Sequence, residues 1–158
     1  MRRLAVLVVL VAGLAACGGD EGADCGPVSR EALDPSSGLH VLPGEDVPEY
    51  ATDPPTSGAH YSLPPPTGAV DEPVDRPLQV TALEGGMVLV QHNGLSDDEV
   101  AELEELGSDQ VIVAPNEDQS EPVVLTAWLT KQTCSGVDVG TVEDFVEEQQ
   151  GRGPGTDF

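Results

Sequence analysis

The chain contains three histidines, and one of them, His60, follows a segment that restricts its own backbone. The segment reads Pro-Pro-Thr-Ser-Gly, from Pro54 to Gly58. Prolines fix the approach of the chain, and a glycine permits a turn that a side chain would hinder. The hydroxyl of Thr56 or Ser57 can hydrogen-bond the backbone of that turn. A histidine held in one direction suits ligand binding, and it equally suits a histidine that hydrogen-bonds a buried carbonyl.

The sequence contains none of the common catalytic motifs. It has no nucleophile elbow, no HExxH zinc motif, no P-loop and no Cys-x-x-Cys pair. Ser57 lies three residues before His60, but this spacing alone does not make a catalytic dyad. The acidic runs 97–99 and 116–118 lack the alternating ligands and central glycine of a calcium loop. The sequence therefore leans against an enzyme.

The first residues predict export and lipid attachment. Arg2 and Arg3 precede an apolar run, Leu4 to Ala16, which is short for a membrane span and typical of a signal peptide. The run leads into Leu-Ala-Ala-Cys, which resembles the lipobox of bacterial lipoproteins and implies lipidation of Cys17. We therefore expect a protein anchored by lipid on the extracytoplasmic side of a bacterial cell membrane. The expected division is a signal peptide (1–16), a lipidated tether (17–24), one domain (25–150) and a C-terminal tail (151–158).

Two further cysteines, Cys25 and Cys134, would meet an oxidising compartment after export, where paired cysteines usually form a disulfide. A bridge between them would close a loop of over one hundred residues, which is worth roughly 4–5 kcal/mol in the chain-entropy view. The alternative is a reactive thiol pair. Without a Cys-x-x-Cys motif, we favour the structural bridge.

The charge of the chain limits its partners. The formal net charge is −23, and loss of Arg2 and Arg3 would leave four of the six basic residues against 29 acidic ones. Such a surface repels nucleic acid and anionic headgroups. We expect no nucleic-acid partner, contact with the membrane through the lipid alone, and a protein or small ligand that the sequence does not identify.

The elements expected around these residues fall into two parts. Residues 25–76 are rich in Pro, Gly, Asp and Ser, which predicts an irregular arm that wraps the domain. The second half predicts strands at 87–92, 110–114 and 123–128, with a further strand at 78–83. The polar loop 115–122 suggests an antiparallel hairpin between the two strands that flank it.

Two helices complete the prediction. Ser96 and Glu99 form a capping box for a helix that ends at Gly107, and Thr141 caps a second helix with Phe145 on its apolar face. The fold class is therefore α+β, with a small mixed or antiparallel sheet and two helices after a proline-rich irregular arm. Trp128, the single tryptophan, is either core packing or a stacking surface for a ligand.

These residues together resemble a known family. His40-Val41, Tyr50, Pro-Pro-Thr-Ser-Gly-x-His at 54–60, Gly68, Leu83-Glu84, Thr126-Ala127-Trp128 and Cys134 are similar to the motifs of the DUF3105 family of bacterial proteins, over about residues 36–148. The family has no established function. The resemblance therefore names a relative and leaves the activity open.

The resemblance implies a metal site, with one departure. The second motif of the family reads approximately His-x-Leu-Glu-His-Gly, and this chain has Thr81 and Gly85 at the two histidine positions. His40, His60 and Glu84 remain as candidate ligands for a transition metal such as Cu or Zn. His92, on the following strand, is a further candidate.

We therefore expect a membrane-anchored, non-enzymatic binding domain whose metal site is weakened or lost. One alternative is a metal-dependent hydrolase or oxygenase that uses His40 and His60, with Glu84 as ligand or general base. A purely structural envelope protein is a third reading.

Overall fold

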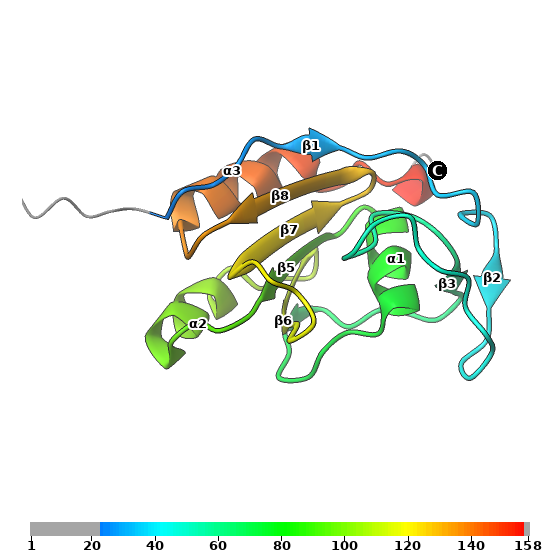
Figure 1. Cartoon of the computed structure of the whole chain (residues 1–158), viewed down its shortest axis with the longest axis horizontal. Coiled ribbons are helices and arrows are strands. Elements are labelled where there is room, and N and C mark those ends of the chain that lie inside the picture. The colour runs from blue at the N-terminus through cyan, green and yellow to red at the C-terminus, as the bar shows by residue number, and fades with distance from the viewer. Residues whose placement is uncertain (1–22, 157–158) are drawn as a thin grey trace, which may run out of the picture.

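The computed structural model describes residues 23–156, which form one mixed six-stranded sheet and a separate two-stranded ladder at one end of the molecule (Figure 1). The predicted α+β class and mixed sheet are confirmed. The order across the sheet is β1-β8-β7-β5-β6-β4. Its strands are β1 (Ser29–Arg30), β4 (Gly68–Ala69), β5 (Val88–His92), β6 (Val111–Pro115), β7 (Val123–Ala127) and β8 (Thr130–Cys134).

Helices cover both faces of this sheet. Strands β4, β5 and β6 run parallel to one another, and parallel strands need crossover connections. Helix α1 (Arg76–Glu84) connects β4 to β5, and α2 (Asp97–Glu104) connects β5 back to β6. The two crossovers run in opposite directions along the sheet, so the right-handed rule places their helices on opposite faces. The core follows this division: Val88 and Val90 pack with Leu103 of α2, and Leu89 packs with Leu83 of α1.

The predicted strand at 78–83 is wrong, because these residues form α1. Leu78, Val80 and Ala82 alternate with polar residues, which is the period of a strand. The tertiary structure requires a helical crossover here. Pro77 in the first turn is compatible with a helix start, because its missing N–H would have no partner there.

The predicted hairpin between β6 and β7 is also wrong. Both strands are present, but they lie on either side of β5, which pairs parallel with β6 and antiparallel with β7. The polar loop between them crosses the end of β5, where the Asn116 N–H donates to His92 O and the Gln119 side chain donates to Gln91 O. The loop therefore connects β6 to β7 across the end of β5, and β7 forms its hairpin with β8 instead.

The two predicted helices are present. Ser96 and Glu99 form the predicted capping box at the start of α2. Helix α3 (Val139–Gln149) begins earlier than predicted, because Asp138 and not Thr141 is its cap: the Asp138 carboxylate accepts from the Thr141 N–H at 3.0 Å. Phe145 is buried against the sheet as expected, and so is Val142. Within residues 23–156, no helix combines the length and hydropathy that spanning a bilayer requires.

The arm before α1 is ordered and wraps the body, as predicted. It contributes β1 at one edge of the sheet and the ladder of β2 (His40–Val41) with β3 (His60–Tyr61). The predicted disulfide between Cys25 and Cys134 is confirmed and ties the start of the arm to β8. The short helix η1 (Pro154–Thr156) follows α3, and the Gly151 N–H donates to Gly86 O just beyond α1.

Candidate metal site

The segment before His60 is a buried, rigid support. Residues Pro54 to His60 are all buried, and the Asp53–Pro54 peptide bond is cis. Gly58 has a φ of +134°, a conformation that favours glycine. A Cβ atom there would lie 2.6 Å from Cδ1 of Tyr50, so the tyrosine ring packs directly on the glycine. The Tyr50 hydroxyl donates to Ala59 O at 2.7 Å, which holds the ring over the turn.

Asp34 connects this support to the rest of the arm. Its N–H donates to Ser57 Oγ, and its buried carboxylate accepts from the Ser36 N–H, the Ser36 hydroxyl and the Ala51 N–H. Ser36 in turn accepts from the Ala59 N–H. Burial alone would raise the pKa of Asp34, but the hydrogen bonds from Ser36 and Ala51 outweigh it and hold the pKa below its ordinary value. Sequence reasoning missed Asp34, although Asp-Pro-Ser-Ser is typical of a turn that bonds its own backbone.

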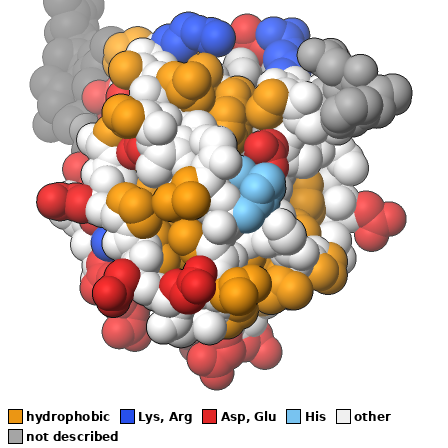
Figure 2. Space-filling model, turned by 90° about the vertical axis from the view of Figure 1, so that its right-hand side faces the viewer, with side chains coloured by type: hydrophobic (Ala, Val, Ile, Leu, Met, Phe, Trp, Pro, Cys, Tyr) orange, Lys and Arg blue, Asp and Glu red, His pale blue; other side chains and the backbone are white. Residues whose placement is uncertain are grey.

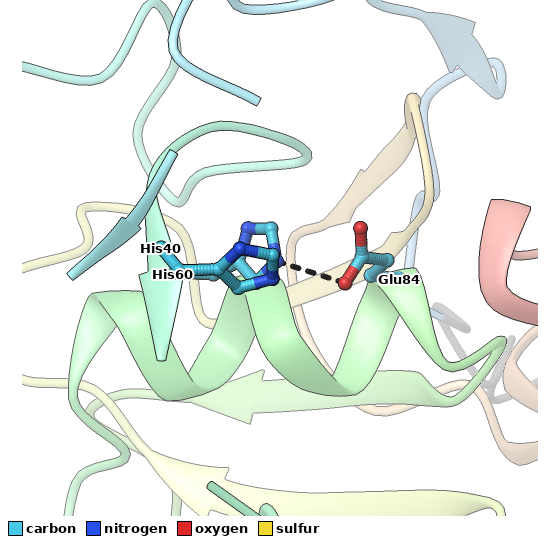
Figure 3. Close-up of side chains that lie close together, drawn as sticks. All are labelled: His40, His60 and Glu84. Carbon is cyan, nitrogen blue, oxygen red and sulfur yellow. Dashed lines mark ion pairs between the residues drawn. The ribbon is translucent and has the colours of Figure 1, made fainter. Parts of the chain in front are cut away.

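The β2–β3 ladder brings two histidines together. His40 and His60 are directly opposite each other in this parallel pair, and the His60 N–H donates to Leu39 O. Side chains at paired positions share a face of the ladder. Their rings are therefore adjacent, with centroids 4.6 Å apart and planes inclined at 71° (Figure 3). His60 is 1 % exposed, while His40 lies at the surface.

Helix α1 supplies the third candidate ligand. Glu84 is its last residue, and Oε2 lies 2.8 Å from Nε2 of His60 (Figure 3). The Thr81 hydroxyl donates to Tyr61 O and fixes the helix against β3. A carboxylate at a helix C-terminus meets the negative end of the dipole, and α1 has no basic residue in its last turn. Glu84 is therefore placed where it gains from a nearby positive charge.

The hydrogen bonds of His60 determine what it presents to Glu84. Its Nδ1 lies 2.9 Å from Gly58 O, and a carbonyl can only accept, so Nδ1 carries the hydrogen. In the neutral ring, Nε2 then has a free lone pair, and it forms no hydrogen bond with any described residue. Two acceptors, Nε2 and the carboxylate, face each other at 2.8 Å. A proton on His60 or a bound cation must neutralise this contact.

The geometry fits a metal ion in part. With bonds of about 2.1 Å, ligand atoms 2.8 Å apart subtend roughly 85° at a metal, which corresponds to neighbouring positions of an octahedral set. Ligand atoms of His40, His60 and Glu84 all lie within 4.8 Å of one another. Two such bonds span at most about 4.2 Å, so the exposed His40 ring has to turn inward to complete the set.

The group opens to the surface. Figure 2 shows histidine in the middle of one face, with an acidic side chain next to it and hydrophobic side chains around. The exposed large hydrophobic residues of the described chain all belong to the arm, and three of them, Leu39, Leu42 and Leu63, follow or precede the histidine strands closely. Glu84 is 34 % exposed. Solvent or a further ligand therefore has access to the three side chains.

The other candidates lie elsewhere. His92 is at the carboxyl end of β5 and does not join the cluster; burial lowers its pKa, against the opposing charge of Glu104. Trp128 lies in the β7–β8 turn, half-buried against the cluster that contains Leu83. Cys17 and the predicted signal peptide before it lie outside the described residues.

Positions 81 and 85 have local roles in this chain. The Thr81 hydroxyl lies within hydrogen-bond distance of both Tyr61 O and Pro77 O, so it holds two backbone segments together. Gly85 is the C-cap residue of α1. Neither provides a metal ligand, and the protein side of the site therefore consists of two imidazoles and one carboxylate.

The structure thus defines an α+β domain with a cluster of two histidines from the arm and one carboxylate from α1. The chain belongs to the DUF3105 family, described as a protein of unknown function, whose sequence model matches residues 40–157. The predicted family is confirmed by this match. The chain matches no curated protein and no solved structure.

Proposed function

We propose that this protein is a lipoprotein anchored through Cys17 outside the cell membrane, and that its domain binds one divalent transition-metal ion, Cu or Zn. The ligands are His40, His60 and Glu84. The domain binds and presents the ion and catalyses no reaction by itself.

The contact between His60 and Glu84 carries the proposal. A buried imidazole nitrogen 2.8 Å from a carboxylate at a helix C-terminus is an arrangement that a cation stabilises. The Gly58 carbonyl acts as the outer partner that orients the imidazole, as is usual for metal-binding histidines. The net charge of −23 also raises the local concentration of cations.

The affinity should be modest. The protein offers three ligands, and structural zinc sites normally use four. His40 must turn inward from the surface, which costs side-chain entropy. We therefore expect a dissociation constant on the order of micromolar.

Calorimetric titration of the purified, disulfide-bonded protein with Zn²⁺ and with Cu²⁺ tests this site. We expect one ion per chain, with His60→Ala abolishing binding and His40→Ala weakening it at least about tenfold. His92→Ala is the matched control, since it removes a histidine outside the cluster and should leave the affinity unchanged. Absence of saturable binding, or an equal loss in the control, would exclude the site. Nanomolar affinity would contradict the expected weakness.

The position of the site supports presentation away from a membrane. The segment that leads into β1 begins at one end of the molecule, and β2 and β3 lie at the other (Figure 1). A lipid at Cys17 with a short tether would then place His40 on the side that faces away from the bilayer.

Cys17→Ser should release the protein from the membrane fraction. If the variant stays there after a high-salt wash, lipid anchoring is wrong.

A metal-dependent hydrolase or oxygenase is the second candidate, favoured by one observation. His40 and Glu84 are accessible, so a metal held by the three side chains would keep open positions for water or substrate. Two histidines and a carboxylate with open positions are also the ligand set of non-haem Fe(II) oxygenases. Tight Fe(II) binding together with oxygen consumption that His60→Ala abolishes would favour this candidate over the binding domain.

A further inference from the structure

A cavity lies at the other end of α1 from Glu84. It has a volume of about 510 Å³ and lies between the first turn of the helix and the arm. Small-molecule sites commonly have volumes of this size. The cavity is distinct from the metal site, because Tyr61 and His60 are successive residues of β3 and point to opposite faces. Its side chains include Glu49, Tyr50, Asp53, Tyr61, Asp75 and Arg76.

The charged groups of this cavity leave an excess of negative charge. Arg76 is already paired with Asp53, at 3.0 Å between the guanidinium and the carboxylate. The carboxylates of Glu49 and Asp75 have no hydrogen-bond or ion-pair partner in the described part of the chain. Asp75 is the N-cap residue of α1, yet its side chain makes no capping hydrogen bond, although that is the usual role of an aspartate there. Two uncompensated carboxylates therefore line the cavity.

The aromatic groups are the second independent feature. Both tyrosines of the chain line this one cavity. Tyr61 is 9 % exposed, and its hydroxyl oxygen has no hydrogen-bond partner among residues 23–156 and is not fully buried. Tyr50 stays neutral: burial, with the nearby Tyr61 and Asp34, raises its pKa to about 12 against the effect of Arg76. Neutral phenol rings offer the electron-rich faces on which cations bind.

We propose that this cavity binds a small organic cation, an alkylammonium compound, between Tyr50 and Tyr61 with Glu49 and Asp75 as counter-charges. An anion would meet the excess negative charge, and Arg76 is engaged by Asp53. A bare metal ion would not use the aromatic surfaces. An alkylammonium group uses both features, because its apolar surface packs on the rings and its charge faces the carboxylates.

Titration with choline and with 3,3-dimethyl-1-butanol tests the proposal. The second compound has the same shape without the charge, so choline should bind at least about tenfold more tightly. Calorimetry gives the affinities. In ¹H–¹⁵N NMR spectra, the residues that shift should include Tyr50 and Arg76.

Variants of the cavity separate a specific site from general electrostatic attraction. Glu49→Gln with Asp75→Asn should lower choline affinity at least about tenfold. The control variant combines Glu143→Gln with Asp144→Asn on α3, which packs on the other face of the sheet from α1. It removes the same number of charges away from the cavity and should change choline affinity little. Tyr61→Phe removes an unpaired hydroxyl and keeps the aromatic face, so the fold should persist and choline affinity should change little. Equal affinity for both compounds, equal loss in the α3 control, or no binding at millimolar choline would overturn the proposal.

Discussion

Replacing Gly58 with alanine should destabilise the arm and displace His60. The φ of +134° at this position is unfavourable for any residue with a side chain. The added methyl would lie 2.6 Å and 2.8 Å from two carbon atoms of the Tyr50 ring. Favourable carbon–carbon contacts are about 3.5–4.0 Å, so the ring has to move by roughly 1 Å. That movement would break the hydrogen bond from Tyr50 to Ala59 O.

The size of the effect follows from these two costs. An unfavourable backbone conformation costs about 1–3 kcal/mol, and the lost hydrogen bond about 0.5–1.5 kcal/mol. We therefore expect the free energy of unfolding to fall by about 2–4 kcal/mol, which lowers the urea midpoint by about 1–2 M at an ordinary slope. The metal affinity should also fall at least about tenfold, because Gly58 O orients the His60 ring.

Urea unfolding of the disulfide-bonded protein measures the first effect, and zinc calorimetry the second. Gly44→Ala is the matched control, since Gly44 has a φ of +88° and nothing within 4 Å of the added methyl. It should cost only about 1–2 kcal/mol from the backbone. If Gly58→Ala loses no more stability than Gly44→Ala, the collision with Tyr50 does not occur and the rigid-support argument is refuted.

Three further predictions concern the elements that hold the site. Replacing Cys25 and Cys134 together with alanine should cost about 4 kcal/mol in urea unfolding, because the bridge closes a long loop across a separation of 109 residues; a loss below about 1 kcal/mol would contradict this. Asp34 has a pKa below the ordinary value of 3.8, so its carboxylate stabilises the fold above pH 3.8 and loses this effect as the pH falls further. The stability of Asp34→Asn should therefore fall less steeply with acid than that of the parent protein. Identical acid unfolding curves would refute the network. Ser96→Ala should lower the free energy of unfolding by about 1 kcal/mol through loss of the capping box, and an unchanged urea midpoint would argue against it.

Local sequence signals predicted the elements that depend on near neighbours. The start of α2 depends on a side chain bonding three residues away, and Ser96 with Glu99 showed it directly. The same reasoning placed the cap of α3 three residues too late, because Asp138 and Thr141 can both cap a helix and Asp138 does so in the structure. The disulfide was predictable for a different reason: with Cys17 assigned to the predicted lipid, two cysteines remain, and two cysteines allow one intramolecular pairing.

Position in the sheet was not a local property. The alternation around Val80 is typical of a strand, but a link between the parallel strands β4 and β5 has to be a crossover, and a helix satisfies its own backbone there. Likewise, nothing in the loop after Pro115 shows that β5 lies between β6 and β7. The order of strands in a sheet depends on which segments, distant in the sequence, pair with each strand. Hydrophobic periodicity is a local signal and does not indicate this order.

The candidate site shows the same division. Residue types and the Pro-Pro-Thr-Ser-Gly segment determined that His60 would be held in a fixed direction, because backbone restriction by proline and glycine acts within a few residues. The tertiary structure alone decided that His40 lies opposite His60 and that Glu84 approaches Nε2 at 2.8 Å. Those distances arise from the pairing of β2 with β3 and the packing of α1 against β3, which join residues up to 44 positions apart in the sequence.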